Sequence, residues 1–226
     1  MKVKAKYDIP IENVRTYEVK NSIIFKKNND SYGELSNMSM KFPLVINGIK
    51  ILNTEALYQS CRFPHLIELQ KKIVFERSPM KVKMISNANK KNSRKDWEDV
   101  KLKVMKWCLN IKLAQHFISF GYILDSTKNL NIVENSSKDN YWGAIPDEDG
   151  SIYTGQNALG RLLMQLREEY RSINKYSLLI VDKPKIEEFN LLEEEIKKID
   201  LREKFIDDLK HYFNNRQLDF FSGRFI

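Results

Sequence analysis

The feature that most constrains the fold is a run of apolar residues at helical spacing in the middle of the chain. These residues recur every three or four positions and so share one face of a helix; they are Trp97, Val100, Val104, Cys108 and Ile111. Ser93 or Asp96 is suited to cap the start of this helix, and Gly121 interrupts the pattern. The spacing therefore predicts one long amphipathic helix that begins near residue 96.

Shorter elements surround this helix. Runs rich in β-branched and aromatic residues predict strands over 16–27, 41–52 and 130–134, with Asn47-Gly48 as a hairpin turn. Helical composition predicts helices over 55–62, which Thr54 would cap, and over 66–76, 79–88 and 155–171.

The rest of the chain completes the predicted order of elements. It comprises a polar loop over 136–155, a strand over 176–181 and two charged helices over 187–215. Strands and helices do not alternate regularly along the chain. We therefore predict the α+β class, as a mainly helical single domain with a small β-sheet.

Composition excludes several classes of protein. The chain has 226 residues, of which 42% are hydrophobic and 30% charged, so it can bury a core and is not disordered as a whole. No apolar run reaches the roughly 18 residues of a membrane span, and the first residues contain no apolar secretion signal. The two cysteines lack a CxxC partner and the three histidines lie far apart, which argues against a disulfide framework and a metal site. We expect a cytoplasmic protein that needs no membrane, metal or cofactor.

Positive charge is concentrated in one stretch. The chain has 38 Lys and Arg residues against 30 Asp and Glu residues, a net charge of +8. Residues 71–106 contain 12 basic and 4 acidic residues, whereas residues 172–226 contain 10 and 11. A basic stretch of this kind can follow a phosphate backbone, so it indicates nucleic acid or a polyphosphate as partner. A solvated surface of a Lys-rich protein explains the same charges.

The first candidate for chemistry is a carboxylate at the start of a mostly apolar helix. Glu55 opens the segment Glu55-Ala56-Leu57-Tyr58-Gln59, where burial would raise its pKa and suit proton transfer. Gln59 and Arg62 follow at i+4 and i+7, so an acid, an amide and a guanidinium share one helix face. That face suits a substrate pocket, but a helix start where the dipole favours a glutamate explains it equally well.

A lysine and two tryptophans are further candidates. Lys83 lies among other cations, which lower a lysine pKa and favour a nucleophilic amine, although it is also one surface lysine among many. Trp97 and Trp142 can stack on a base, but Trp97 lies on the apolar stripe, where core packing is the alternative. Trp142 stands in a polar loop beside Asp139 and Gly143, where contact with a ligand is expected.

Two glycine-containing segments are candidates for binding an anion. They are Gly33-Glu34-Leu35-Ser36-Asn37 and Gly155-Gln156-Asn157-Ala158-Leu159-Gly160. The second opens a predicted helix, so its backbone N–H groups could hold an anion. Its spacing is not that of a Walker A or GxGxxG loop, and a glycine turn with close helix packing explains it as well.

Six segments taken together resemble the NADAR family, also called YbiA-like. They are YGELSN (32–37), TEALYQSCRFP (54–64), SPMKVK (78–83), RKDW (94–97), DNYWG (139–143) and GQNALGRLLM (155–164). The resemblance covers about residues 22–171, which it implies are a catalytic domain of that fold. Residues 1–21 would then be an N-terminal extension, and residues 172–226 a C-terminal extension of strand and helices without an assigned role.

The resemblance implies N-glycosidase activity on bases linked to ribose. It assigns catalysis to Glu55, Lys83 and Asp139. It assigns substrate binding to Gly33, Ser36, Asn37, Gln59, Arg62, Trp97, Trp142, Gly143 and Asn157. It implies no metal and no cofactor.

Two branches of this resemblance have different substrates. One cleaves phosphoribosylamino intermediates of riboflavin synthesis, and the other resembles antitoxins of DarT-type toxins and removes ADP-ribose from guanine in DNA. Arg62 and Lys83 favour the second, because the riboflavin type tends to have Lys at the first position and no Lys at the second. ADP-ribosylated DNA and a DarT-type toxin are then the expected partners. A non-catalytic binder of modified DNA or toxin is the remaining alternative, and the sequence predicts no oligomeric state.

Overall fold

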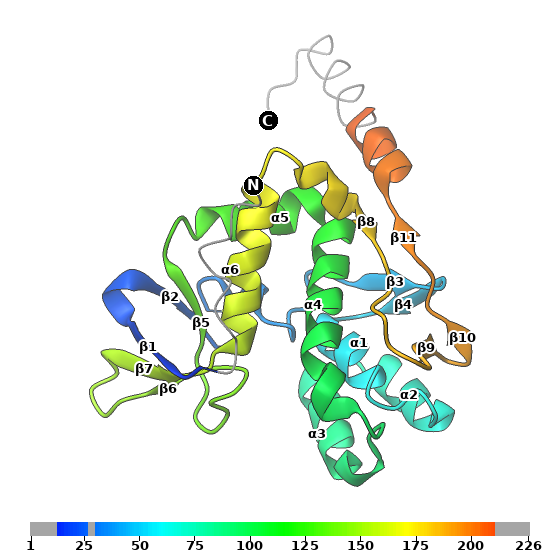
Figure 1. The fold of residues 1–226 in the computed structure, drawn as a ribbon, viewed down its shortest axis with the longest axis horizontal. Coiled ribbons are helices and arrows are strands. Elements are labelled where there is room, and N and C mark those ends of the chain that lie inside the picture. The colour runs from blue at the N-terminus through cyan, green and yellow to red at the C-terminus, as the bar shows by residue number, and fades with distance from the viewer. Residues whose placement is uncertain (1–12, 27–29, 211–226) are drawn as a thin grey trace.

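The computed structural model describes residues 13–26 and 30–210 of the chain, and Figure 1 shows how its elements are arranged. The α-helices are α1 (Thr54–Ser60), α2 (Ile67–Val74), α3 (Pro79–Ala88), α4 (Trp97–Gln115), α5 (Phe117–Ser126) and α6 (Ala158–Arg171), and residues 202–210 are also helical. The strands are β1 (Arg15–Glu18), β2 (Ser22–Phe25), β3 (Leu44–Ile46), β4 (Ile49–Ile51), β5 (Asn131–Glu134), β6 (Ile145–Pro146), β7 (Ile152–Gly155), β8 (Ile180–Val181), β9 (Asn190–Leu191), β10 (Glu194–Glu195) and β11 (Ile199–Asp200). Short 3₁₀ helices are η1 (Val19–Asn21), η2 (Gly33–Leu35), η3 (Lys90–Asn92) and η4 (Lys175–Leu179). Helices dominate and the strands are short, which confirms the α+β class.

The helix predicted from the apolar stripe is confirmed as α4, which stands in the centre of the molecule (Figure 1). Helices α1, α5 and α6 all pack against it. Burial extends beyond the predicted stripe, because Trp107, Leu109 and Leu113 are covered as well. A helix covered on several sides forms the middle of a core, so the other elements are positioned by their contact with α4.

The strands form several small sheets. β1, β7 and β6 make a three-stranded antiparallel sheet, β3 and β4 a hairpin, and β2 and β5 a parallel pair. The single strand predicted over 16–27 is divided into β1 and β2 by the turn η1, and residue 27 lies outside the described residues. Asn47 and Gly48 have φ angles of 49° and 76° between β3 and β4, the left-handed geometry that an Asn-Gly turn favours, so the predicted hairpin turn is confirmed.

The segment after α6 differs from the prediction. The strand expected over 176–181 is mostly the 3₁₀ helix η4, with two residues in β8. The charged helices expected over 187–215 are wrong up to residue 200, where β9, β10 and β11 lie; a helix begins at residue 202, and residues 211–215 are outside the described part. Phe189 is buried, with its ring 4.9 Å from the ring of Trp107. Its burial against α4 outweighs the helix propensity of the charged residues around it.

A helix break also falls at a different residue from the predicted one. α4 and α5 are separated at His116, whose backbone leaves helical geometry and whose Nε2 lies 2.7 Å from the carbonyl oxygen of Pro43. Gly121 continues α5, and a Cβ at this position would lie 2.3 Å from the ring of Tyr170. The glycine therefore marks close packing of α5 on α6 and not a helix end.

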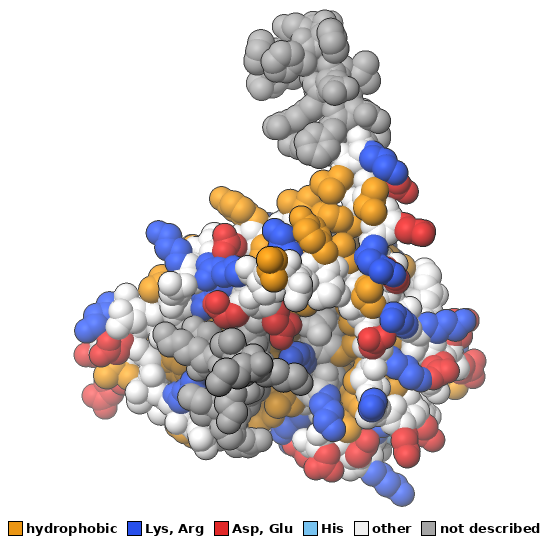
Figure 2. Space-filling view, turned by 45° about the horizontal axis from the view of Figure 1, so that its top comes forward, with side chains coloured by type: hydrophobic (Ala, Val, Ile, Leu, Met, Phe, Trp, Pro, Cys, Tyr) orange, Lys and Arg blue, Asp and Glu red, His pale blue; other side chains and the backbone are white. Residues whose placement is uncertain are grey.

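Hydrophobic side chains are exposed at the end of the molecule where α5 meets the last described helix (Figure 2). They are Ile118, Tyr122, Ile173, Tyr176 and Ile206. Beneath them the ring of Phe117 lies 5.8 Å from that of Tyr176 and 5.3 Å from that of Phe205. This aromatic cluster attaches helix 202–210 to the body of the protein. Within the described ranges, no helix is both long and apolar enough to cross a bilayer.

A lysine is buried in α4 and holds a loop of the predicted site. Lys112 is completely buried, and its ammonium donates to the carbonyl oxygens of Glu34 and Ser36 at 2.8 and 3.2 Å. The ammonium also lies 4.3 Å from the centre of the Phe120 ring. Burial lowers the pKa of this lysine to about 7. Lys112 thus ties residues 33–37 to the central helix.

We expect the pH dependence of stability to reveal this lysine. Its pKa falls from 10.5 to about 7 on folding, so between these values the unfolded chain binds the extra proton and stability rises with pH. Lys112→Met lacks this proton. In urea unfolding followed by circular dichroism, the free energy of unfolding of the wild type minus that of Lys112→Met should rise from pH 7 to pH 9, by at most about 1.4 kcal/mol per pH unit. An equal difference at both pH values would contradict burial of a neutral amine.

Candidate active site

The candidate site is built around the first turn of α1. Asn53 caps this helix, because its Oδ1 accepts a hydrogen bond from the N–H of Ala56 at 2.9 Å, so the predicted cap at Thr54 is wrong by one residue. The N–H of Glu55 donates to the carbonyl oxygen of Asn37 at 2.9 Å. These bonds fix the backbone around Glu55, whose side chain is held in the interior with 7% of the residue exposed.

Burial determines how Glu55 holds a proton. Desolvation raises the pKa of this carboxyl group, whereas the hydrogen bond from Gln59 Nε2, 2.8 Å long, and the positive charge of Lys83 lower it. The negative charge of Asp139 raises it further. A carboxyl group under such opposing influences is suited to exchange a proton during a reaction.

Lys83 approaches Glu55 from the neighbouring helix. α3 spans the predicted residues 79–88, with Ser78 as its cap and Pro79 as its first residue, and it packs against α1. The side chain of Lys83 is exposed. Its positive charge lowers the pKa of both Glu55 and Glu134, so the ammonium lies within electrostatic reach of both carboxyl groups. The structure thus brings together the lysine and the glutamate that the sequence proposed as catalytic partners.

Glu134 belongs to the same group, although no motif in the sequence singled it out. It is the last residue of β5, and its N–H donates to Asn157 Oδ1 at 3.1 Å. Desolvation raises the pKa of Glu134 to about 7, Lys83 opposes the rise, and Glu55 and Asp139 add to it. The signal in the sequence was a glutamate that ends a predicted strand and precedes the polar loop with Asp139.

Asp139 organises the loop that follows β5. Its Oδ1 accepts hydrogen bonds from the N–H groups of Tyr141 and Trp142 at 3.0 and 2.9 Å, and its own N–H donates to Ser136 Oγ at 2.9 Å. One carboxylate oxygen therefore shapes the loop. The negative charge still acts on Glu55 and Glu134, so Asp139 lies at the site as the resemblance implied.

Gly143 allows this loop to lie against β5. A Cβ at Gly143 would lie 2.5 Å from the carbonyl oxygen of Glu134. The residue itself is buried. The structure therefore gives Gly143 a positioning role through close approach of two backbones, in place of the predicted contact with substrate.

The start of α6 is not free to hold an anion, contrary to one prediction. The N–H groups of residues 156–159 donate to the carbonyl oxygens of residues 140–143 at 2.6–3.1 Å. Asn157 is completely buried, and its side-chain amide binds the carbonyl of Ile132 and the N–H of Glu134. Gly160 lies so near β5 that a Cβ would be 2.0 Å from the oxygen of Ile132. The segment fastens α6 to the loop and β5, so close packing is the correct alternative and Asn157 is a structural residue.

The aromatic side chains form one connected group beside Glu55. The ring of Tyr58 lies 5.1 Å from that of Trp97 and 5.6 Å from that of Trp142, which is 4.9 Å from the ring of Tyr141. Trp97 is 5% exposed and belongs to the core, so the predicted stacking on a base is not open to it. Trp142 is partly exposed and keeps a surface that a ligand can contact.

Arg62 is buried as well, although the resemblance assigned it to substrate binding. Its Nε donates to Ser93 Oγ at 2.6 Å and its Nη1 to Ser86 Oγ at 3.4 Å. The guanidinium lies 5.4 Å from the centre of the Trp97 ring. Ser86 in turn donates to Gln59 Oε1, so Arg62 is linked to the predicted Gln59 and not placed at the surface.

The residues predicted to bind substrate in the loop 33–37 are buried or hydrogen-bonded to other parts of the protein. Gly33 is buried in η2. Ser36 Oγ accepts a hydrogen bond from the N–H of Met38 at 3.2 Å. Asn37 Nδ2 donates to Met105 Sδ at 3.0 Å, whereas its buried Oδ1 has no hydrogen-bond partner among the described residues. Of the three, Asn37 is therefore the residue whose side chain keeps a polar atom without a hydrogen bond among the described residues.

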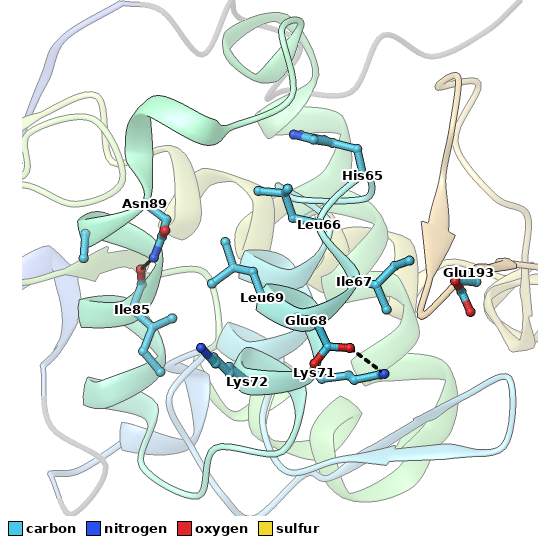
Figure 3. Close-up of a pocket in the computed structure, with 11 residues that line it drawn as sticks. His65, Leu66, Ile67, Glu68, Leu69, Lys71, Lys72, Ile85, Asn89 and Glu193 are labelled. Carbon is cyan, nitrogen blue, oxygen red and sulfur yellow. Dashed lines mark hydrogen bonds and ion pairs between the residues drawn. The ribbon is translucent and has the colours of Figure 1, made fainter.

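An open cavity of about 760 Å³ lies elsewhere, between α2 and α3 (Figure 3). Leu66, Leu69 and Ile85 line it together with charged residues, among which Glu68 pairs with Lys71 at 2.8 Å. No residue predicted as catalytic or substrate-binding lines this cavity. It is therefore distinct from the group around Glu55.

The group around Glu55 defines a class of site. A lysine and three carboxyl groups, two of them with raised pKa values, lie within electrostatic reach of one another. Such a group can supply a nucleophile, an acid and a base. In residues 13–26 and 30–210, no three His, Cys, Asp or Glu side chains are arranged to hold a metal ion. Fold and site together describe an α+β protein in which a lysine and several carboxyl groups act on one another electrostatically.

The chain belongs to the NADAR family, because the NADAR domain matches its residues 24–171. N-glycosidase YbiA of Escherichia coli (strain K12) is 32% identical over 163 residues, which are 71% of this chain and 97% of that protein. The fold is also similar to the NMR structure of the E. coli protein YbiA, with a TM-score of 0.57 and 32% identity over 67% of this chain and 85% of that one.

Other relatives match this chain over only part of their own length. Riboflavin biosynthesis protein VVA0006 of Vibrio vulnificus is 28% identical over 177 residues, 77% of this chain and 46% of that protein. N-glycosidase Npun_R5314 of Nostoc punctiforme is 30% identical over 96 residues, 42% of this chain and 58% of that protein. The family thus includes N-glycosidases, which are hydrolases, as the resemblance implied.

We expect the charge of Lys83 to be measurable at Glu134. In Lys83→Met the pKa of Glu134 should rise above about 7, because the cation that lowers it is gone. A rise of about half a unit is expected for a nearby charge, and ¹³C NMR of the carboxyl carbons measures it. Lys81→Met is the control, because Lys81 is an exposed cation of α3 that does not act on Glu134. An unchanged titration in Lys83→Met would mean that the ammonium lies away from these acids.

Proposed function

We propose that this chain is an N-glycosidase that hydrolyses the bond between the anomeric carbon of a ribose and the amine of a base. The proposal is supported by the approach of the Lys83 ammonium to Glu55 and Glu134, with Asp139 beside them. Relatives named N-glycosidase support the same class of reaction. A reaction at an anomeric carbon needs proton transfer to leaving groups, which these carboxyl groups can provide.

In the proposed reaction Glu55 and Lys83 act in turn. A proton from Glu55 goes to the ring oxygen, the ring C–O bond breaks, and the base nitrogen forms an imine with C1. Glu55, now a carboxylate, takes a proton from the Lys83 ammonium, and the resulting amine adds to C1. A proton passes from the lysine nitrogen to the base nitrogen, the bond between C1 and the base breaks, and the base leaves as a free amine, which gives a protonated lysine imine. Water then adds to C1, the lysine nitrogen takes up the proton that the new hydroxyl group loses, and the C1–N bond breaks to give the sugar aldehyde and the Lys83 ammonium.

Direct attack by water is the alternative route. Glu55 would then act as a general base for a water molecule at an oxocarbenium-like C1, by analogy with the carboxylates of glycoside hydrolysis. Glu134, with a pKa of about 7, is a second group that can hold the proton. Lys83 would stabilise the carboxylates in this route and form no bond to C1.

The proposed substrate is ADP-ribose attached to guanine in DNA, and the proposed role is that of an antitoxin to a DarT-type toxin. Lys83 and its neighbours support this choice, because Lys81, Lys90 and Lys91 are also exposed on α3 and the turn η3. Exposed cations beside the site suit a phosphate backbone. A modified guanine in a duplex would have to leave the base stack, or be met on a single strand, to reach Glu55.

A phosphoribosylamino intermediate of riboflavin synthesis is the second candidate substrate. It is favoured by the names of two relatives, the Vibrio vulnificus protein and Riboflavin biosynthesis protein PYRR of Arabidopsis thaliana, which is 37% identical over 111 residues. That match covers 47% of this chain and 18% of the Arabidopsis protein. Both candidate substrates carry an amine on C1 of a ribose, so the same residues serve either one.

Lys83→Ala should abolish turnover by the imine route and leave the fold intact, because the side chain is exposed. Borohydride added during turnover should reduce the lysine imine and leave a sugar-derived mass on the peptide that contains Lys83, as measured by mass spectrometry. Wild-type rate in Lys83→Ala, without an adduct in the wild type, would replace the imine route by direct attack of water.

Glu55→Gln should lower kcat by about 10²–10⁴-fold in either route, because it removes the group that transfers the proton. Glu68→Gln is a matched control, since Glu68 is an exposed carboxylate on α2 away from the site. Circular dichroism confirms that both variants are folded. Full activity in Glu55→Gln would remove Glu55 from the mechanism.

The two substrates are distinguished by product analysis. Wild type is incubated with a guanine-ADP-ribosylated oligonucleotide and, separately, with a phosphoribosylamino pyrimidine, and released sugar is quantified by chromatography. We expect release of ADP-ribose from the oligonucleotide. Release from the pyrimidine alone would give the riboflavin-type function. Salt-sensitive DNA binding that persists in Glu55→Gln and Lys83→Ala without any product would indicate a binding module.

A further inference from the structure

A chain of hydrogen bonds connects Arg62 to Glu55 inside the protein. Arg62 Nη1 donates to Ser86 Oγ at 3.4 Å, and Ser86 Oγ donates to Gln59 Oε1. Gln59 Nε2 donates to Glu55 Oε1 at 2.8 Å. None of the four residues is more than 7% exposed, so water does not compete for these bonds. Glu55 and Gln59 lie on one face of α1 as the sequence predicted, Arg62 follows the end of that helix at Ser60, and Ser86 from α3 completes the connection.

The chemistry of arginine determines which group donates and which accepts in each of these hydrogen bonds. A guanidinium has only donors, so the Ser86 hydroxyl must accept a hydrogen bond from Arg62 and can donate its own O–H to Gln59. Gln59 accepts that hydrogen bond at Oε1, so its NH₂ group points toward Glu55. An NH₂ group that faces a carboxyl group favours the carboxylate. Without Arg62, Ser86 could accept from the NH₂ of Gln59, and the amide oxygen would then face Glu55 and favour the protonated acid.

The guanidinium is held in one orientation. Its centre lies 5.4 Å from the ring centre of Trp97 and 5.7 Å from that of Phe63. Ser93 accepts from Nε at 2.6 Å, and Ser86 accepts from Nη1. Two aromatic rings and two hydroxyl groups therefore fix the Arg62 guanidinium, which determines the donor and acceptor at each step of the hydrogen-bond series.

We propose that Arg62 is a positioning residue that orients the Gln59 amide toward Glu55 through Ser86, and that it does not bind the phosphate or ribose of the substrate. The proposal rests on the proposed N-glycosidase function, in which Glu55 transfers the proton. It assigns Ser86, which no motif singled out, a part in the same arrangement.

Other ionisable groups also face Glu55, and they must be separated from this effect. They are Lys83 on α3, Glu134 at the end of β5, Asp139 in the loop after it, Tyr58 on α1 and Cys108 on α4. The hydrogen bonds of Ser86 go to Arg62 and Gln59, so a change at Ser86 leaves these five groups in place. A shift in the titration of Glu55 in Ser86→Ala can therefore be assigned to the amide.

The test compares the pH dependence of kcat in variants of the full chain. In Ser86→Ala the limb of the profile that reports Glu55 should move to higher pH by about 0.5–1 unit, as expected when part of a hydrogen bond to a charged group is lost. Values of KM should change less than about twofold, because the substrate contacts remain. Arg62→Met should give the same shift, and Arg62→Lys, which keeps a side chain with donors only, should restore part of the wild-type profile.

Ser60→Ala is the matched control. Ser60 is also completely buried, and its Oγ donates to the carbonyl of Leu57 within α1. The control should keep the wild-type pH profile. An unmoved profile in Ser86→Ala and Arg62→Met, with KM raised about tenfold or more in Arg62→Met, would overturn the proposal and make Arg62 a contact of the substrate.

A second readout separates this proposal from the proposed function. Without any substrate, ¹³C NMR should show the carboxyl of Glu55 titrating at higher pH in Ser86→Ala than in the wild type. That result supports the hydrogen-bond chain even if the wild type cleaves neither candidate substrate. An unchanged titration of Glu55 would overturn the positioning role whatever the activity, and it needs only Ser86→Ala if Arg62→Met does not fold.

Discussion

The buried carboxyl group of Glu55 is the constraint on which the rest of the site depends. A carboxylate that leaves water loses a large solvation energy, so it must find donors or positive charge inside the protein. Gln59 supplies a donor, Lys83 supplies the charge, and the carbonyl of Asn37 fixes the helix start that carries the acid. These groups come from α1, α3 and the loop 33–37. Packing of those elements and protonation of Glu55 are therefore coupled.

Side chains that bind backbone atoms hold the loops of the site, because the strands are too short to do so alone. Lys112 binds two carbonyl groups of the loop 33–37, and Asn157 joins β5 to the start of α6. Asp139 shapes the loop after β5 through two N–H groups. Each such bond contributes only about 1 kcal/mol, but together they hold the catalytic side chains in place before a substrate arrives.

Family membership and local geometry both support the proposed class of reaction. The matched residues 24–171 contain every side chain proposed for catalysis. The structure adds what a family match does not, namely the electrostatic effect of the lysine on the acids and the presence of Glu134 among them. The two proposed substrates rest on different observations. Exposed lysines on α3 support the proposed DNA substrate, whereas the names of two relatives support the proposed riboflavin intermediate.

Spacing along the chain determined the central helix α4, the helix α3, the hairpin turn and the helix face that carries Glu55, because each depends on residues a few positions apart. Tertiary structure decided the rest. Phe189 lies in the core because its ring packs against Trp107 of α4. The charged residues around it therefore form strands and not the predicted helices. Arg62 turns inward because α3 packs against α1 and brings Ser86 to it, and Glu134 joins the site through the charges of Lys83 and Glu55. The sequence determined which side chains share a local face. The fold decided which of these side chains are buried and come near one another, because desolvation depends on segments that are far apart in the sequence.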